Sequence, residues 1–427
     1  MIKEKAKPWL WRMTILAFIL LLVSGGFAPR AQAAEKTPKI KAKSYVVMDA
    51  ESGSILLAKK EDTPLPPASM TKMMAEYLVL EAIKKGDISW DQKVKVSANA
   101  SKIEGSQVWL AEKEVRTVKE LFTAMSVYSA NDATVALAEL LAGDETAFVE
   151  QMNAKAKKMG LINTHFRNST GLPQNMYPDP PKVGGKHYMS AKDSATLARH
   201  LLQDYPEITE FSTIPEQTFR KGEPGAIDMV NWNWMIKGLD FEYEGVDGLK
   251  TGETDAAGAC FTGTAKRGKM RLITVVMGTK SRNTRFEETK KLLDYGFSNF
   301  KVKEFMKKNA TVKGFETVEV TGGTETEVGV TTAARVRMAY KTSAEKKYKP
   351  QVTLKGDLQA PIKKGDVVGE VTYTINGKPV PNIEPVKLVA KDDVEEASWL
   401  RLFFRSIKDI FVNFFNGIAD SIKGLFS

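Results

Sequence analysis

The chain has 427 residues, of which 43% are hydrophobic and 27% are charged, and its formal net charge at neutral pH is +10. This length predicts two or three folded units. Cys260 is the only cysteine, so an intramolecular disulfide is excluded, and its apolar neighbours predict a buried core residue. The three histidines form no His-Glu-x-x-His motif, which argues against a zinc peptidase, and we expect neither a metal nor a cofactor.

Residues 1–33 have the pattern of a secretory signal peptide. Basic residues precede an apolar run from Met13 to Val23, and Ala31-Gln32-Ala33 is typical of a cleavage site. A transmembrane anchor is the alternative, but the run is short for a membrane span. Removal of 1–33, with its five basic residues and one acidic residue, leaves a net charge of +6. Export and this modest charge argue against a nucleic-acid partner.

Strands are predicted at both ends of the following segment, with helices between them. We expect a hairpin over 43–60 and, after Pro66-Pro67, a helix from about Ser69 to Ile83. Helical spacing then predicts helices over 118–125, 133–141, 145–159 and 190–202, the last opened by a Ser190–Asp193 capping box. A strand follows near Val246, then a hairpin of 259–266 with 270–278, and a helix over 285–297. These elements predict an α+β domain, 34–302, with one sheet, helices on its faces and a helical insert.

The composition changes after Phe300. Residues 311–389 are rich in β-branched residues, Gly and Pro, which predicts a small all-β sandwich domain over 303–392. The end of the chain, 393–427, differs again, because apolar residues recur every three or four positions from Leu400 to Leu425 opposite charged residues. We expect 398–427 to form an amphipathic helix in the membrane surface, and a core or coiled-coil helix is the alternative.

Three short motifs carry the candidate chemistry: Ser69-Met70-Thr71-Lys72, Ser129-Ala130-Asn131 and Lys250-Thr251-Gly252. They supply a nucleophile, an amine that activates it, a second hydroxyl and a cation. Singly they are weak, since Ser-x-x-Lys recurs at 343–346 and Ser-x-Asn at 97–99, whereas Lys-Thr-Gly occurs once. The combination therefore carries the prediction, and we expect the three motifs to meet at one crevice.

Ser69 and Lys72 are three residues apart on a predicted helix, so their side chains are neighbours. For Lys72 to act as a base, its pKa must fall from the usual value of about 10.4, and burial and a second cation such as Lys250 both lower it. The helix N-terminus also offers backbone N–H groups to an oxyanion, including that of Ser69.

The other two motifs each have a structural alternative. In the second motif, the functional interpretation makes Ser129 a proton relay and Asn131 a hydrogen-bonding partner of a substrate amide. The alternative is that these residues only cap the following helix. In the third motif, Gly252 permits close approach of the backbone to a ligand, and Lys250 and Thr251 are suited to binding a carboxylate. The alternative there is a plain edge strand with an exposed lysine.

The motifs in this order resemble those of serine-type penicillin-binding proteins and serine β-lactamases. The stretches 67–74, 129–133, 168–172 and 246–252 are similar to those of low-molecular-mass D-alanyl-D-alanine carboxypeptidases of the penicillin-binding protein 5 type. The resemblance covers nearly the whole mature chain, and a trailing β-domain and an amphipathic C-terminal anchor also belong to that group.

The resemblance implies a mechanism on peptidoglycan pentapeptide. Ser69 attacks the carbonyl of the penultimate D-Ala, Lys72 takes its proton and Ser129 returns a proton to the leaving D-Ala. Lys250 and Thr251 hold the terminal carboxylate, and the backbone N–H of Glu253, beside Gly252, is the second oxyanion donor. Relatives often carry His at the Glu253 position, so the acid departs from their pattern. β-Lactams acylate the same serine.

Three other functions stay open on these residues. A class A β-lactamase carries a glutamate about thirty-six residues after the serine of its second motif, where this chain has His165, and no Glu-x-x-Leu-Asn lies between Ser129 and Lys250. A D,D-endopeptidase and a non-catalytic wall-binding module are the others. In each case we expect an exported protein on the outer face of the cytoplasmic membrane, anchored peripherally by 398–427.

Overall fold

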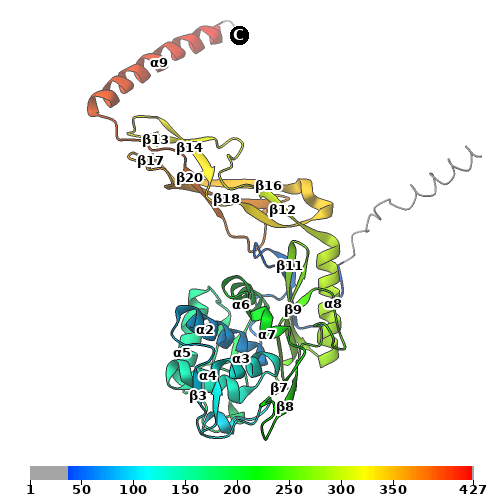
Figure 1. The fold of residues 1–427 in the computed structure, drawn as a ribbon. Coiled ribbons are helices and arrows are strands. Elements are labelled where there is room, and N and C mark those ends of the chain that lie inside the picture. The colour runs from blue at the N-terminus through cyan, green and yellow to red at the C-terminus, as the bar shows by residue number, and fades with distance from the viewer. Residues whose placement is uncertain (1–36, 426–427) are drawn as a thin grey trace, which may run out of the picture. The chain divides into compact units, whose positions relative to one another are not determined.

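A computed structural model describes residues 37–425, so the predicted signal peptide lies outside the described residues (Figure 1). Its central feature is a five-stranded antiparallel sheet in the order β2-β1-β11-β10-β9. The strands are β1 (Ser44–Asp49), β2 (Ile55–Lys59), β9 (Val246–Thr254), β10 (Gly258–Arg267) and β11 (Met270–Thr279). Both predicted hairpins are confirmed, and Cys260 is buried on β10, as expected.

Helices cover both faces of this sheet. One face carries α2 (Lys72–Lys85), α3 (Val118–Val127), α4 (Asn131–Ala142), α5 (Glu145–Lys158), α6 (Ala191–Asp204) and α7 (Ile208–Ser212), and α8 (Arg282–Asn299) lies on the other (Figure 1). The first predicted helix differs at its start, because Ser69 lies in a separate 3₁₀ turn, η1 (Ala68–Thr71). The predicted capping box of α6 is also incomplete: Ser190 caps Asp193 N, while the Asp193 carboxylate accepts hydrogen bonds from Asn163 N and Thr164 Oγ1.

Short elements that were not predicted complete this half. They are β3 (Lys93–Lys95), η2 (Ala100–Lys102), β4 (Val115–Thr117), β5 (Thr164–His165), η3 (Gln174–Met176), β6 (Tyr188–Met189), β7 (Glu216–Phe219) and β8 (Ile227–Val230). The strands pair as three small antiparallel hairpins, β3–β4, β5–β6 and β7–β8.

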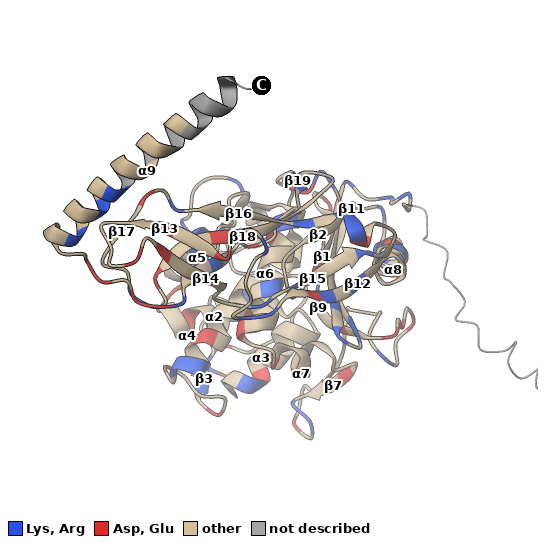
Figure 2. Ribbon diagram, turned by 90° about the horizontal axis from the view of Figure 1, so that it is seen from above, with Lys and Arg blue, Asp and Glu red and all other residues tan. Residues whose placement is uncertain are grey.

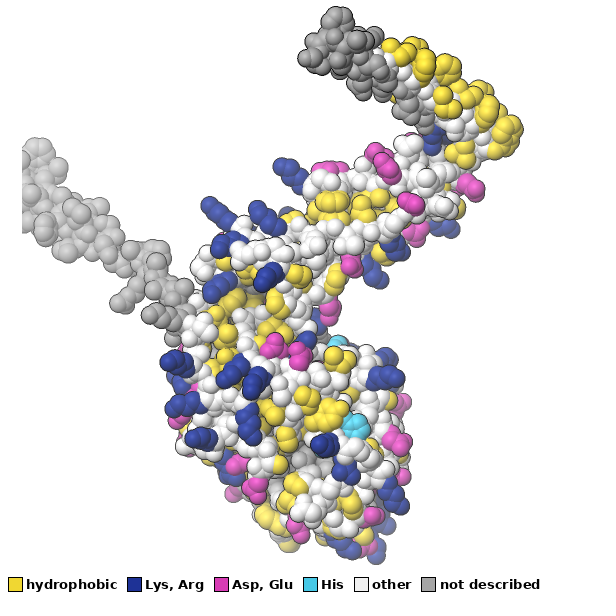
Figure 3. Space-filling model, turned by 180° about the vertical axis from the view of Figure 1, so that it is seen from behind, with side chains coloured by type: hydrophobic (Ala, Val, Ile, Leu, Met, Phe, Trp, Pro, Cys, Tyr) yellow, Lys and Arg dark blue, Asp and Glu magenta, His cyan; other side chains and the backbone are white. Residues whose placement is uncertain are grey.

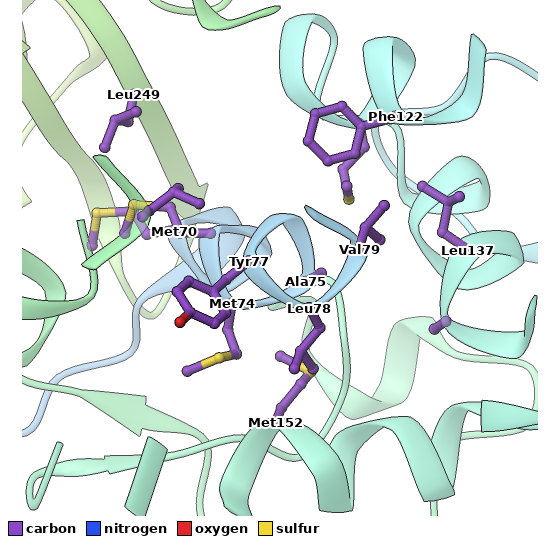
Figure 4. Packing of buried hydrophobic residues seen from close by; sticks show 14 of the residues in the cluster. Met70, Met74, Ala75, Tyr77, Leu78, Val79, Phe122, Leu137, Met152 and Leu249 are labelled. Atoms are coloured by element: carbon purple, nitrogen blue, oxygen red, sulfur yellow. The ribbon is translucent and has the colours of Figure 1, made fainter. Parts of the chain in front are cut away.

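Helix α2 passes through the main hydrophobic core. Its own apolar side chains, among them Met74, Leu78 and Val79, lie in one cluster with Phe122 of α3 and Leu137 of α4 (Figure 4). A helix that is buried all round needs little amphipathic pattern, and its position in the core is fixed by packing. This packing holds the first residue of α2, Lys72, rigidly behind the η1 turn.

Between α8 and the last helix the chain is built of strands. Its strands are β12 (Phe300–Met306), β13 (Thr317–Thr321), β14 (Glu327–Thr332), β15 (Val336–Lys341), β16 (Tyr348–Leu354), β17 (Leu358–Gln359), β18 (Val367–Ile375), β19 (Lys378–Pro379) and β20 (Val386–Ala390), with a 3₁₀ segment η4 (Thr342–Lys347). One sheet has the order β16-β18-β20-β14-β13-β17, and β12 pairs with β15 in another. Valines and Met338, Tyr373 and Leu388 form a core of their own between them.

The chain ends in α9 (Trp399–Leu425), which confirms the predicted helix. Most of its described apolar side chains are exposed, Trp399 by 76% and Phe414 by 62%, and they cover much of the helix surface (yellow in Figure 3). No helix among the described residues is long and apolar enough to cross a membrane. Elsewhere, Lys and Arg are interspersed with Asp and Glu along the ribbon (Figure 2).

Candidate active site

The η1 turn holds the predicted nucleophile at the mouth of a cleft. Thr71 Oγ1 donates a hydrogen bond to the Ala68 carbonyl over 2.8 Å and lies 2.9 Å from His187 Nε2, which ties the turn to a neighbouring loop. Ser69 is half-buried, and its Oγ lies 3.1 Å from Lys72 Nζ. The turn therefore presents the hydroxyl to the cleft and to the amine together.

The Lys72 amine is fully buried and has three neighbours. It lies 2.7 Å from Asn131 Oδ1, 3.0 Å from the Thr170 carbonyl oxygen and 3.1 Å from Ser69 Oγ. Burial, and secondly the Lys250 charge, hold the pKa of Lys72 well below its usual value. The amide and the carbonyl accept hydrogen bonds, whereas the serine hydroxyl is also able to donate one. This environment suits a neutral amine.

The second motif forms the tight connection between α3 and α4. Ser129 has a φ of +61°, a left-handed conformation that is uncommon for residues other than glycine. Its Oγ is buried and has no hydrogen-bond partner among the described residues. The N-cap of α4 is Ala130, without a side-chain cap, so Ser129 does not cap this helix. The capping alternative is wrong for Ser129.

Asn131 is already engaged by the protein itself. Its Oδ1 accepts a hydrogen bond from Lys72 and its Nδ2 donates to the Glu104 carbonyl over 2.7 Å. The side chain therefore positions the Lys72 amine and ties it to the loop that follows Glu104, in addition to lining the cleft.

The residue after this motif anchors the same loop, which the sequence did not predict. The Asp132 carboxylate is buried and accepts hydrogen bonds from the backbone N–H groups of Val108 and Leu110, at 3.1 and 3.0 Å. Ser106 is fixed likewise, since its Oγ donates to the Tyr128 carbonyl over 2.6 Å. One wall of the cleft is thereby bonded to the turn that carries Ser129.

The third motif lies on β9, beside the η1 turn. Lys250 is 2% exposed, and its Nζ donates to the Thr251 carbonyl over 3.3 Å. Burial lowers the pKa of Lys250 to about 8, while the Glu76 carboxylate opposes the shift. The alternative was an edge strand with an exposed lysine: β9 is indeed an edge strand of the sheet, but the exposed lysine is wrong, because Lys250 is buried.

Gly252 permits a close approach to the protein's own backbone, whereas the sequence suggested an approach to a ligand. A Cβ at this position would lie 2.6 Å from the Pro67 carbonyl oxygen and 3.0 Å from Ser69 N. The first contact is shorter than real Cβ atoms make, so only glycine lets β9 pack this tightly against η1. The strand and the nucleophile are thus held in fixed relation.

Two arginines of α8 border the site and were not predicted. Arg282 pairs with the carboxylate of Glu253, which offsets the acid at that position. Arg285 is 2% exposed, lines the cleft, and its Nε has no hydrogen-bond partner among the described residues. Burial lowers the pKa of Arg285 to about 10, which leaves the guanidinium charged at neutral pH.

These elements enclose a cleft of about 780 Å³. Six of the eight predicted site residues line it, namely Ser69, Ser129, Asn131, Thr251, Gly252 and Glu253, and the two lysines lie buried behind them. The second Ser-x-x-Lys match, at 343–346, lies in η4 of the all-β half and does not line the cleft. The expected convergence of the three motifs is therefore observed.

Comparison with known proteins agrees with this geometry. The family model of peptidase S11, D-alanyl-D-alanine carboxypeptidase, matches residues 31–281, and the model of the penicillin-binding protein 5 C-terminal domain matches residues 300–396. The chain belongs to the D-alanyl-D-alanine carboxypeptidase family. It is accordingly a serine-type carboxypeptidase with the predicted α+β fold and a C-terminal β-domain.

Relatives of this carboxypeptidase match almost end to end. It is 36% identical to the D-alanyl-D-alanine carboxypeptidase DacF of Bacillus subtilis, over 93% of this chain and 97% of DacF. It is 35% identical to DacC of Escherichia coli, over 87% and 90% of the two chains. Among solved structures, penicillin-binding protein 5 of Haemophilus influenzae is 33% identical with a TM-score of 0.72, covering 85% of this chain and all of that one.

A second structural neighbour was solved with an antibiotic. Penicillin-binding protein D2 of Listeria monocytogenes, in its ampicillin-bound form, is 33% identical with a TM-score of 0.53. It covers 62% of this chain and all of its own length.

Proposed function

We propose that this carboxypeptidase removes the terminal D-Ala from peptidoglycan pentapeptides through an acyl-enzyme on Ser69. The observation that carries the proposal is the environment of Lys72 Nζ. A neutral amine has two N–H donors and one lone pair, and Asn131 Oδ1 and the Thr170 carbonyl are the two acceptors. The lone pair then faces the Ser69 hydroxyl, which is the arrangement that a general base requires.

The first half of the reaction follows from this geometry. Ser69 Oγ attacks the carbonyl carbon of the penultimate D-Ala while its proton passes to Lys72 Nζ. The backbone N–H groups of Ser69 and Glu253 receive the developing oxyanion. The tetrahedral intermediate then collapses, and the C–N bond breaks as the D-Ala nitrogen takes the proton that Lys72 holds, relayed through the Ser129 hydroxyl, which leaves Lys72 neutral again. The buried hydroxyl of Ser129, which has no partner among the described residues, supports this relay role.

The second half releases the shortened peptide. Water attacks the ester carbon, gives a proton to Lys72, and the bond to Ser69 Oγ breaks as the serine regains its proton. Before either half of the reaction, the substrate must bind, and Lys250, Thr251 and Arg285 bind its terminal carboxylate. Arg285 lines the cleft, its guanidinium is charged at neutral pH, and its buried Nε has no partner among the described residues, which together support its place in this set.

We further propose that β-lactams acylate Ser69 and that the adduct is released slowly. The ampicillin-bound Listeria neighbour supports the first part. For the second, the residue at the position of the class A β-lactamase glutamate is His165. Its Nδ1 donates a hydrogen bond to the Lys186 carbonyl, and it is not among the residues that line the cleft.

The division of the chain is also a proposal: a signal peptide 1–33, a catalytic domain 34–302, an all-β domain 303–392 and a membrane-surface helix 393–427. The separate family matches and the separate core of the β-domain support it. The exposed apolar side chains of α9 support peripheral attachment to the outer face of the cytoplasmic membrane.

The direct test is release of D-Ala from a peptide that ends in D-Ala-D-Ala. We expect the parent to release D-Ala and the Ser69→Ala variant to lose on the order of 10⁴-fold or more in kcat, since serine enzymes lose this much without their nucleophile. A Ser343→Ala variant, which alters the other Ser-x-x-Lys match, serves as the control with parental activity. Equal rates for Ser69→Ala and the parent would overturn the assignment.

A further inference from the structure

Three basic side chains are buried at the cleft, and something must balance their charge. Lys72, Lys250 and Arg285 are each at most 2% exposed. Removing a charged group from water is costly unless an opposite charge or hydrogen bonds compensate it. The site binds an anionic substrate only if some of these groups stay protonated, so the source of the balancing charge matters for catalysis.

Three carboxylates near the site are already engaged elsewhere. Asp132 accepts backbone hydrogen bonds from the loop at Val108 and Leu110. Glu145 accepts hydrogen bonds from Ser169 and Tyr177. Glu253 pairs with Arg282 at the rim of the cleft. Asp132 and Glu145 therefore anchor loops, and Glu253 is the partner of a half-exposed arginine.

Glu76 differs from these three groups. It is 2% exposed and follows Lys72 by four residues on α2, so the two side chains lie on the same face of the helix. Helix α2 packs against β9, which carries Lys250, and both lysines act electrostatically on the Glu76 carboxylate. Its hydrogen bond with Ser126 of α3 holds it in place.

The charged groups around Lys250 come from two helices. Glu76 on α2 favours its ammonium form, whereas Arg285 on α8 disfavours it, and Lys72 on α2 is a second like charge when protonated. Glu76 is therefore the carboxylate that stabilises the Lys250 charge. This role does not follow from the three motifs, because it depends on packing of α2 against β9.

We propose that Glu76 is a positioning residue that keeps Lys250 protonated while Lys72 remains a neutral base. The proposal rests on the proposed function, in which Lys250 binds the carboxylate of the substrate. Glu76 touches neither the substrate nor the reacting atoms and acts through Lys250. Its charge also raises the pKa of Lys72, so removing it favours the neutral base as well.

The sign of the expected effect follows from the electrostatics. Burial raises the pKa of Glu76 to about 7, so the carboxylate is ionised above neutral pH, in the range where Lys250 titrates. Removing that negative charge lets Lys250 lose its proton at lower pH. Binding of the carboxylate substrate then weakens at a lower pH than in the parent.

The test measures kcat and KM across the neutral and alkaline range, with the full chain and a peptide that ends in D-Ala-D-Ala. For Glu76→Gln we expect the alkaline limb of kcat/KM to move about one pH unit lower, since a nearby opposite charge shifts a pKa by about 1–3 units. Above that limb, KM rises about tenfold, which is the same one-unit shift expressed as a ratio. The kcat value changes little.

Two further variants separate charge from structure. Glu76→Met removes the charge with a side chain of similar length and no desolvation cost, so it provides the same test if the glutamine variant folds poorly. Glu288→Gln is the matched control, because Glu288 is 1% exposed and is held by Lys291 and Lys41 N rather than by the active-site lysines. Its pH profile should equal that of the parent.

The outcomes distinguish this inference from the function on which it rests. If the parent releases no D-Ala, the proposed function fails. If the parent is active and Glu76→Gln only lowers kcat/KM equally at every pH, Glu76 has a structural role and the inference is wrong. An alkaline limb that moves in both Glu76 variants and stays in place in Glu288→Gln supports it.

Discussion

At the scale of single residues, the site is built from polar groups that the fold buries without complete compensation. Ser129 Oγ and Arg285 Nε have no partner among the described residues, and Lys72 and Lys250 are buried amines. Most buried polar groups in proteins are hydrogen-bonded, so exceptions that share one cleft indicate function. The charge state of each amine then decides which step of the reaction it serves.

The first residue-scale prediction concerns pH. Activity requires neutral Lys72 and protonated Lys250, so kcat/KM rises as Lys72 loses its proton and falls as Lys250 loses its own. The pKa of Lys72 is held well below its usual value and that of Lys250 is about 8. We therefore expect a bell-shaped profile with an alkaline limb near pH 8. A kcat/KM that still rises beyond pH 10 would contradict a role for the Lys250 ammonium.

The second residue-scale prediction concerns Arg285. Replacement by Met keeps much of the stem and removes the charge, so we expect KM for a peptide with a free terminal carboxylate to rise on the order of tenfold or more, the value of a charged hydrogen bond. A peptide with an amidated C-terminus is the matched control substrate, and its slower turnover should not change between parent and variant. Equal KM changes for both peptides would place Arg285 in a purely structural role.

At the scale of elements, the site depends on one contact between a 3₁₀ turn and a strand. The η1 turn brings Ser69, and β9 brings the third motif, and they approach closely enough at Gly252 that no side chain fits between them. The loop beyond Asn168 closes the same region, because the Thr170 carbonyl accepts from Lys72. Residues far apart in sequence are thus held in fixed relation by close backbone packing.

The element-scale prediction is that Gly252→Ala inactivates the enzyme without unfolding it. The added methyl group must push β9 away from the Pro67 carbonyl, 2.6 Å from the new Cβ, and so displaces Thr251 from Ser69. Overpacking of this kind costs about 1–3 kcal/mol. We expect acylation by a fluorescent penicillin to slow at least about 100-fold, since small misplacements cost this much.

Gly356→Ala is the control for that variant, because a Cβ at Gly356 would meet nothing within 4 Å. It should acylate like the parent. Circular dichroism and thermal unfolding of both variants establish that each is folded. Normal acylation of Gly252→Ala would show that the contact between η1 and β9 does not position the site.

The sequence predicted the elements that have strong periodicity and left out those that have none. The hairpin of β10 and β11 and the helices α3 to α6 lie where alternation, helical spacing and Gly stops indicated. The strands of β3–β4 and β7–β8 have three or four residues each, too short for a period to register.

The same limit applies to the site. All eight predicted residues lie at the cleft or directly behind it. The sequence could predict them because they belong to, or directly follow, the three motifs. Glu76, Asp132 and Arg285 were missed, because their importance arises from tertiary neighbours. The helix that carries Glu76 is buried all round, so no polar face marks the glutamate as unusual.

At the scale of the whole molecule, the exposed apolar surface of α9 is not covered by any other part of the described chain. Its exposed side chains include Phe403, Phe411 and Phe414, whereas Arg405 donates to the carbonyls of Gly323 and Thr324 in the β-domain. A soluble protein rarely leaves so continuous an apolar surface uncovered. A lipid interface would cover it without requiring the helix to span the bilayer.

We therefore predict that a chain ending before Trp399 no longer sediments with vesicles that contain anionic lipids, while its rate of D-Ala release from a soluble peptide is unchanged. Replacing Phe403, Phe411 and Phe414 by Ser should have the same effect on sedimentation. The control is Ile162→Ser, at another exposed apolar residue, 81% exposed and outside α9. Continued sedimentation of the truncated chain would exclude α9 as the anchor.

The measurement that tests the central claim most directly is the mapping of the acyl adduct. The full chain is incubated with ampicillin, digested, and its peptides are analysed by mass spectrometry. The account predicts one adduct, on Ser69, which is absent from Ser69→Ala and forms far more slowly in Lys72→Met. An adduct on any other residue, or an undiminished adduct in Ser69→Ala, would contradict it.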